Sequence, residues 1–104
     1  LHLFKVAGIT KRFRYTCINE SEGELSDKMR GLFQACVINI QAVGNLIVVK
    51  TLNGNGANAG VVIDRLNYKE VVGSVAGDDT TLLICESPAD ALSVRDRLNK
   101  IIQG

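Results

Sequence analysis

The chain has 104 residues, of which 46% are hydrophobic, and its 12 basic and 11 acidic side chains leave a net charge of +1. This length allows one domain and little more, and the apolar fraction is too high for a disordered segment. Apolar runs such as Leu46–Val49 are far shorter than the ~20 residues that a membrane-spanning helix needs, so we expect no membrane partner.

The basic residues are unevenly distributed along the chain. Residues 1–18 contain four basic side chains and no acid, a charge of +4, whereas residues 19–104 carry a charge of −3. A basic segment joined to an acidic body suggests contact with nucleic acid, and the alternative is a solvated strand face. The candidates for contact with a phosphate backbone are Lys5, Lys11, Arg12 and Arg14.

The cysteines indicate the compartment. Cys17, Cys36 and Cys85 lie far apart, with no C-x-x-C pair and with His2 as the one histidine of the sequence. An odd, scattered set argues against a disulfide framework and against a structural zinc site. We therefore expect a cytoplasmic protein without a metal or cofactor.

The first elements expected along the chain form a β-hairpin. Two β-prone runs, Leu1–Val6 and Arg12–Ile18, are joined by residues 7–11. An isolated hairpin is marginal in water, so residues 1–18 should belong to a larger unit. Residues 19–25 are mostly polar and acidic, typical of a linker, and we place a domain at residues 26–104.

A helix is expected directly after this linker. Ser26 is a suitable N-cap, and Gly31 weakens the helix interior. Apolar side chains at helical spacing predict one buried stripe. The stripe comprises Leu25, Met29, Leu32, Phe33 and Cys36.

From residue 37 the pattern predicts the order β-β-α-β-β-α. Strands are expected at residues 37–40, 46–51, 71–75 and 81–86, and helices at about 57–66 and after the capping sequence Ser87-Pro88-Ala89-Asp90. We therefore predict an α+β fold, a two-layer sandwich with both helices on one face of a mostly antiparallel four-stranded sheet. The apolar open face of that sheet suggests self-association.

Glycines between a strand and a helix fit a relaxed dinucleotide-binding fingerprint, Gly54-x-Gly56-x-x-Ala59. That fingerprint requires a parallel βαβ unit and a second nucleotide-binding half, for which the remaining chain is too short. We retain only the weaker statement that backbone N–H groups at this helix start could hold a carboxylate.

Two adjacent acids, Asp78 and Asp79, lie at an expected hairpin tip. Ordinary turn chemistry is the simpler interpretation. The functional interpretation is a receptor for a cation such as a guanidinium, whose paired donors suit carboxylates. Adjacent side chains point in different directions, so two separate contacts are more natural than a shared acid–base pair. An enzyme using either acid would lack an identifiable partner residue, so we do not expect an enzyme.

The acidic pair belongs to a longer segment that carries a family resemblance. Gly73-Ser74-Val75-Ala76-Gly77-Asp78-Asp79-Thr80 closely resembles the Gly-Thr-Ile-Ala-Gly-Asp-Asp-Thr signature of bacterial arginine repressors. Val48-Val49-Lys50-Thr51-Leu52-Asn53-Gly54-Asn55 is similar to that family's strand and Thr-x-Pro-Gly-Asn loop, and Val62-Ile63-Asp64 to Gly73 follows at matching spacing. The resemblance covers residues 37–104. More loosely, the N-terminal hairpin resembles the wing of the family's winged helix-turn-helix domain.

The resemblance implies a C-terminal domain that forms trimers, two of which stack into a hexamer with L-arginine between them. By the family pattern, Asp78 and Asp79 would bind the cationic groups of the ligand, and backbone around Ser74 and Ala76 would frame it. Residues 54–58, among them Ala57 and Asn58, would line the site. Arginine would act as a corepressor that stabilises the hexamer on operator DNA in the full-length regulator of arginine metabolism.

Two positions depart from the family pattern. Asn53 stands where the family has a loop proline, and Ala57 stands where it has Gln or Asn, with Asn58 beside it. Because Ala57 cannot form a side-chain hydrogen bond, the alternative function is an assembly domain that has lost or changed arginine sensing. No helix-turn-helix precedes residue 1, so we expect a portion of a longer repressor that assembles and binds ligand but binds DNA poorly.

Overall fold

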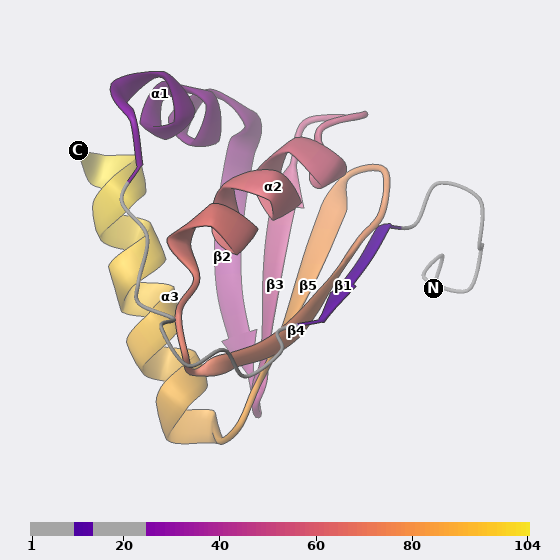
Figure 1. Ribbon diagram of the computed structural model, residues 1–104, viewed down its shortest axis with the longest axis vertical. Helices are drawn as coiled ribbons and strands as arrows, with labels where there is room; N and C mark the ends of the chain where they lie inside the picture. The colour runs from indigo at the N-terminus through magenta and orange to yellow at the C-terminus, as the bar shows by residue number, and fades with distance from the viewer. Residues whose placement is uncertain (1–9, 14–24) are drawn as a thin grey trace.

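The computed structural model of the chain describes residues 10–13 and 25–104. In this part of the chain, five strands form one antiparallel sheet in the order β1-β4-β5-β3-β2, and three helices accompany it (Figure 1). The elements are β1 (Thr10–Phe13), α1 (Asp27–Cys36), β2 (Val37–Val43), β3 (Leu46–Thr51), α2 (Gly56–Leu66), β4 (Val71–Ala76), β5 (Thr80–Cys85) and α3 (Pro88–Gln103). The predicted α+β class and the order β-β-α-β-β-α over residues 37–104 are confirmed.

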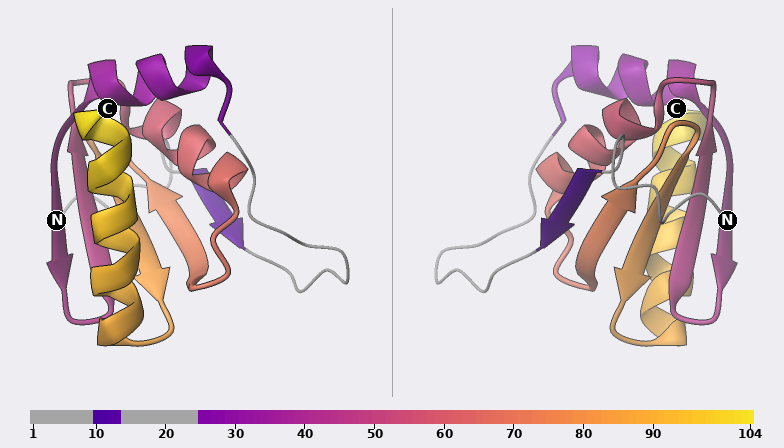
Figure 2. Two further views of the ribbon diagram at one scale, coloured as in Figure 1. Left: turned by 90° about the vertical axis from the view of Figure 1, so that its left-hand side faces the viewer. Right: turned by 90° about the vertical axis from the view of Figure 1, so that its right-hand side faces the viewer.

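Helices α2 and α3 lie on the same side of the sheet, and α1 crosses over their ends (Figure 2). The hydrophobic core fills the space between these helices and the sheet. Alternate residues of β3 and β5 point into it, and their fully buried side chains include Ile47, Val49 and Leu83. The helices contribute Phe33, Ala59, Val62, Ala91, Val94 and Leu98, all of them fully buried.

Capping residues set the starts of α1 and α3 as the sequence predicts. The side-chain oxygen of Ser26 accepts a hydrogen bond from the backbone N–H of Met29, and that of Ser87 accepts one from Asp90. Each cap satisfies a donor that a helix start leaves without an intrahelical partner. The buried side of α3 comprises Ala91, Val94, Leu98 and Ile101, which lie at helical spacing.

The predicted stripe of α1 is wrong in one position. Phe33 and Cys36 are buried, and Leu25 and Met29 pack partly against the core, but Leu32 is 39% exposed. A step of one residue turns a helix by about 100°, so with Phe33 directed at the core its neighbour Leu32 lies at the margin of the buried side.

Strand β2 is longer than the sequence predicts. It continues to Val43, and a two-residue turn at Gly44 and Asn45 leads into β3. Gly44 adopts φ 60, a conformation that a residue without Cβ takes readily. Asn45 anchors the turn, because its Nδ2 donates to the carbonyl oxygen of Cys85 and its own carbonyl oxygen accepts from the backbone N–H of Cys85.

Strand β1 extends the sheet beyond the four strands expected. It pairs with β4 from Thr10 opposite Ala76 to Phe13 opposite Gly73. Thr10 and Lys11 therefore belong to a strand, whereas the sequence places them in a hairpin turn. Residues 1–9 and 14–18 of the predicted hairpin and residues 19–24 of the predicted linker lie outside the described residues, so the domain boundaries remain predictions.

The second face of the sheet carries no described helix, and we call it the open face. It is apolar at its centre, as the sequence predicts, and the cross-strand register places six apolar residues on it. Five of them are partly buried by their neighbours and Val43 is 52% exposed. The six are Val43, Leu46, Val48, Val75, Leu82 and Ile84.

Candidate ligand-binding site at the acidic turn

Residues 77–79 connect β4 and β5, and backbone hydrogen bonds hold this turn from two sides. The N–H of Gly56 donates to the carbonyl oxygen of Asp78 at 2.9 Å, and the N–H of Thr51 donates to that of Asp79 at 2.8 Å. Within the turn, the N–H of Gly77 donates to the carbonyl oxygen of Thr80 at 2.7 Å. The backbone of the acidic pair is therefore fixed to the start of α2 and to the end of β3.

Gly56 makes the contact between α2 and the turn possible. A Cβ at this position would collide with the carbonyl oxygen of Gly77 and lie 3.2 Å from the backbone nitrogen of Thr80. The fully buried hydroxyl of Thr81 donates to the carbonyl oxygen of Gly56 at 2.6 Å. The start of α2 at Gly56 and the acidic pair, far apart in sequence, thus meet at one end of the sheet.

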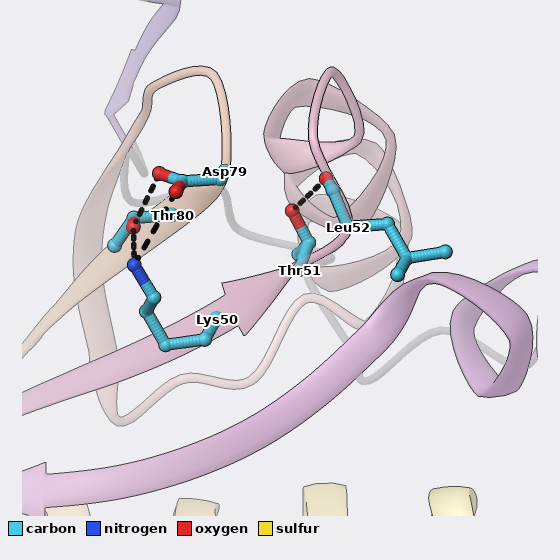
Figure 3. Close-up of polar contacts among 5 residues, drawn as sticks. All are labelled: Lys50, Thr51, Leu52, Asp79 and Thr80. Carbon is cyan, nitrogen blue, oxygen red and sulfur yellow. Dashed lines mark hydrogen bonds and ion pairs between the residues drawn. The ribbon is translucent and has the colours of Figure 1, made fainter.

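The carboxylate of Asp79 has two intrachain partners (Figure 3). Its Oδ1 accepts a hydrogen bond from the hydroxyl of Thr80 at 3.0 Å, and its Oδ2 lies 3.5 Å from Nζ of Lys50. The same ammonium donates to Oγ1 of Thr80 at 3.1 Å. The hydrogen bond from Thr80 and the positive charge of Lys50 lower the pKa of Asp79 below its ordinary value.

The neighbouring Asp78 has a different environment. Asp78 is exposed, and its carboxylate has no hydrogen-bond or ion-pair partner among residues 25–104. The two acids therefore do not form a shared pair, and their separate contacts to a ligand remain a prediction. Asp78 is the acid that an external cation can approach without displacing a group of the chain.

The first turn of α2 lies beside the acidic turn and is exposed at both predicted positions. Ala57 and Asn58 face solvent. The Nδ2 of Asn58 donates to Oδ1 of Asn55 at 2.9 Å, which leaves Oδ1 of Asn58 as an acceptor. An acceptor beside two carboxylates suits a ligand rich in N–H donors.

Ser74 and Ala76 are both buried, and their side chains are directed at α2 instead of at solvent. Oγ of Ser74 lies 3.5 Å from Oδ1 of Asp64, and a Cβ on Gly60 would lie 3.4 Å from that of Ala76. The side chains at these two positions are therefore not available to a ligand, and a role of their backbone in the site remains a prediction.

The predicted DNA-contact residues receive no test from the structure. Lys11 and Arg12 lie in β1, of which the backbone alone is described, and Lys5 and Arg14 lie outside the described residues. Their role remains a prediction.

Sequence reasoning assigned no role to three residues of this site: Lys50, Thr80 and Thr81. A signal for Lys50 was present, because it is the one charge in the apolar strand 46–51. Its partner could be found only from the register, which pairs Lys50 with Thr80.

The described residues contain no cluster of three or more His, Cys, Asp or Glu side chains that could hold a metal ion. None of the helices in this part of the chain is long and apolar enough to cross a membrane.

Comparison with known proteins identifies the family. Residues 33–100 match the family model of the arginine repressor C-terminal domain. The arginine repressor of Clostridium tetani is 35% identical over 103 residues, which cover 99% of this chain and 67% of that protein. An arginine repressor of Clostridium botulinum is 36% identical over 102 residues, which cover 98% of this chain and 68% of that protein. The chain thus belongs to the arginine repressor family, which consists of transcription regulators and not of enzymes.

Proposed function

We propose that this chain is the effector-binding and assembly part of an arginine-responsive regulator of arginine metabolism, acting in the cytoplasm. One observation carries the proposal. Two carboxylates lie on a turn whose backbone is hydrogen-bonded to the start of α2 and to the end of β3, and the carboxylate of Asp78 has no partner among the described residues. A rigid receptor loses little conformational entropy when it binds a ligand.

The cationic groups of L-arginine fit this arrangement. A guanidinium offers paired N–H donors that suit the unpaired carboxylate of Asp78, and the α-ammonium suits Asp79. The first-turn N–H groups of α2 at Ala57 and Asn58 have no acceptor within the helix and suit the ligand carboxylate. Arginine is the effector here, and no cofactor is required.

Assembly would follow from the open face. Six apolar side chains on one sheet surface favour burial against further copies of the chain. We propose a trimer, with two trimers stacked as a hexamer and arginine bound between them. A ligand held by both trimers favours the hexamer, because binding to the assembled state alone shifts the equilibrium toward it.

In the longer protein the hexamer would present several DNA-binding domains to operator DNA, with arginine as corepressor. The basic residues Lys5, Lys11, Arg12 and Arg14 would contact phosphates from the wing. Phosphate contacts position a protein on DNA without specifying the sequence, so this part of the chain alone should bind DNA weakly.

Light scattering with and without L-arginine tests the proposal, applied to the unmutated chain and to Asp78→Asn. Arginine should stabilise a hexamer of the unmutated chain and have no such effect on Asp78→Asn. The control is Asp96→Asn, which removes an exposed carboxylate of α3 that is paired with the adjacent Arg95. A monomer under every condition would contradict the proposal.

The second candidate is an assembly domain that has lost or changed arginine sensing. The exposed Ala57 favours it, because that position offers no side-chain hydrogen bond to a ligand. A trimer or hexamer that is indifferent to arginine, with no heat of arginine binding by calorimetry, would support this second function.

A further inference from the structure

The ammonium of Lys50 occupies a position that a ligand cation would need. Its Nζ lies 3.5 Å from Oδ2 of Asp79 and 3.1 Å from Oγ1 of Thr80, and the hydroxyl of Thr80 donates to Oδ1 of Asp79. Both oxygens of this carboxylate therefore have partners before any ligand arrives. In Figure 3 the side chain of Lys50 extends from β3 toward Asp79 in the turn before β5 and toward Thr80 at the start of β5.

We propose that Lys50 is an intrachain competitor for the ligand cation, which holds Asp79 in the ligand-free chain and must be displaced on binding. The inference rests on the function proposed above and adds to it a residue that sets affinity. Asp78, with no partner among the described residues, would then be contacted first, and Asp79 only after Lys50 has moved.

The geometry allows this displacement. The side chains of Lys50 and Asp79 are 45% and 47% exposed, and a half-exposed ion pair at 3.5 Å is weak. The lysine side chain is long and flexible, so its ammonium can move into water without a change in β3. A guanidinium makes two parallel hydrogen bonds to a carboxylate where an ammonium makes one, and it can therefore replace Lys50.

The competition also adjusts the charge of the site. With Lys50 in place, Asp79 is neutralised and Asp78 supplies the remaining negative charge. A ligand with a single cationic group can bind Asp78 and leave Lys50 where it is. Displacement of Lys50 needs a second cationic group at the right distance, so Lys50 lowers the affinity for ligands with two cationic groups and leaves the affinity for single-cation ligands unchanged.

The test is isothermal titration calorimetry with L-arginine and with agmatine, the amine that lacks the carboxylate of arginine. Lys50→Gln removes the competing charge, and Lys50→Met does so with a side chain that suits the apolar open face. Both variants should bind both ligands about two- to five-fold more tightly, the range expected for release of an exposed ion pair. The gain should shrink as salt is added.

Two controls accompany the variants. Lys50→Arg keeps the charge and should not bind either ligand more tightly. Lys100→Gln removes an exposed lysine from the last turn of α3 and should leave binding unchanged.

The outcomes separate this inference from the proposed function. If the unmutated chain binds arginine and neither neutral variant binds it more tightly, Lys50 is not a competitor. If the variants bind arginine more weakly and agmatine as before, Lys50 instead holds the ligand carboxylate and the inference is wrong. If neither the unmutated chain nor the neutral variants bind arginine, the proposed function itself fails.

Discussion

The backbone N–H of Gly56 donates to the carbonyl oxygen of Asp78 at 2.9 Å, so the first residue of α2 is bonded directly to the acidic turn. The bond joins the acidic turn to the residue that directly follows segment 48–55, so it links the two parts of the chain on which the family resemblance rests. It also gives Gly56 a structural reason that does not involve nucleotide binding. The backbones of α2 and of the acidic turn approach so closely that a side chain at this position would not fit.

Substitution of Gly56 by alanine should destabilise the protein. The added Cβ would meet the carbonyl of Gly77, which is backbone and cannot rotate away. We expect a loss of about 1–3 kcal/mol in the free energy of unfolding, the usual cost of overpacking. Urea denaturation at one fixed protein concentration measures it, since assembly makes the apparent stability depend on concentration.

Gly31→Ala is the matched control for this substitution. A Cβ on Gly31 has no neighbour within 4 Å, and the residue lies exposed within α1. Alanine should therefore stabilise the protein by about 0.5–1 kcal/mol, because it favours a helix interior over glycine. Equal effects of the two substitutions would show that helix propensity, not the contact with Gly77, decides the result at Gly56.

Local rules were enough to predict most of the fold. Ser26 and Ser87 cap their helices because the side-chain oxygen of each serine can accept a hydrogen bond from the backbone N–H three residues later. The turn at Asp78 and Asp79 follows from Gly77 and the acids themselves. The length of β2 was missed because Gln41 is polar, yet in a sheet with an open face a polar residue continues the strand on that side.

The partners in the site could not be predicted in the same way. Lys50 and Asp79 are 29 residues apart, and they meet only because β3 and β5 are neighbours in the register that places Lys50 opposite Thr80. Sequence patterns fix the faces of strands well and the pairing of distant strands poorly. The sequence therefore suggests the acids as a candidate cation site, whereas it does not reveal Lys50 as the cation that the chain itself supplies.

The ion pair between Glu70 and Arg97 should make stability depend on pH. The two groups lie 2.7 Å apart, and the Arg97 guanidinium also stacks over the Tyr68 ring at 4.4 Å. Burial by itself raises the pKa of Glu70, but its own backbone N–H and the charge of Arg97 outweigh burial and leave that pKa below the ordinary value of 4.5. The stabilisation is therefore complete above pH 4.5 and is lost as the pH falls through the lower folded-state pKa.

Glu70→Gln tests this dependence. The variant should be less stable than the unmutated chain by about 1 kcal/mol at neutral pH, and the difference should disappear in acid. Thermal unfolding followed by circular dichroism from pH 7 to pH 3 measures it. The control Asp96→Asn removes a carboxylate that is 63% exposed and should change stability little at any pH. A Glu70→Gln deficit that persists at the lowest pH would mean that packing, not charge, is responsible.

Cys36 and Cys85 should be unreactive in the folded protein. Both are buried, and burial, with a smaller contribution from the charges of Asp90 and Glu70, raises the pKa of Cys85 to about 11. Burial likewise raises the pKa of Cys36. At pH 8 the thiolate, which is the reactive form, is therefore scarce in both residues and shielded from reagents.

Labelling with a thiol reagent checks this expectation. The experiment uses the Cys17→Ser variant, because Cys17 lies outside the described residues and would add a third thiol to the signal. At pH 8 we expect no rapid reaction in native buffer and two equivalents of label in concentrated urea, where burial no longer protects either thiol. The labelling rate in native buffer should follow the population of the unfolded chain, so Gly56→Ala should accelerate it and Gly31→Ala should slow it. Fast labelling of the folded protein would show that one of these thiols is more accessible than its buried position allows.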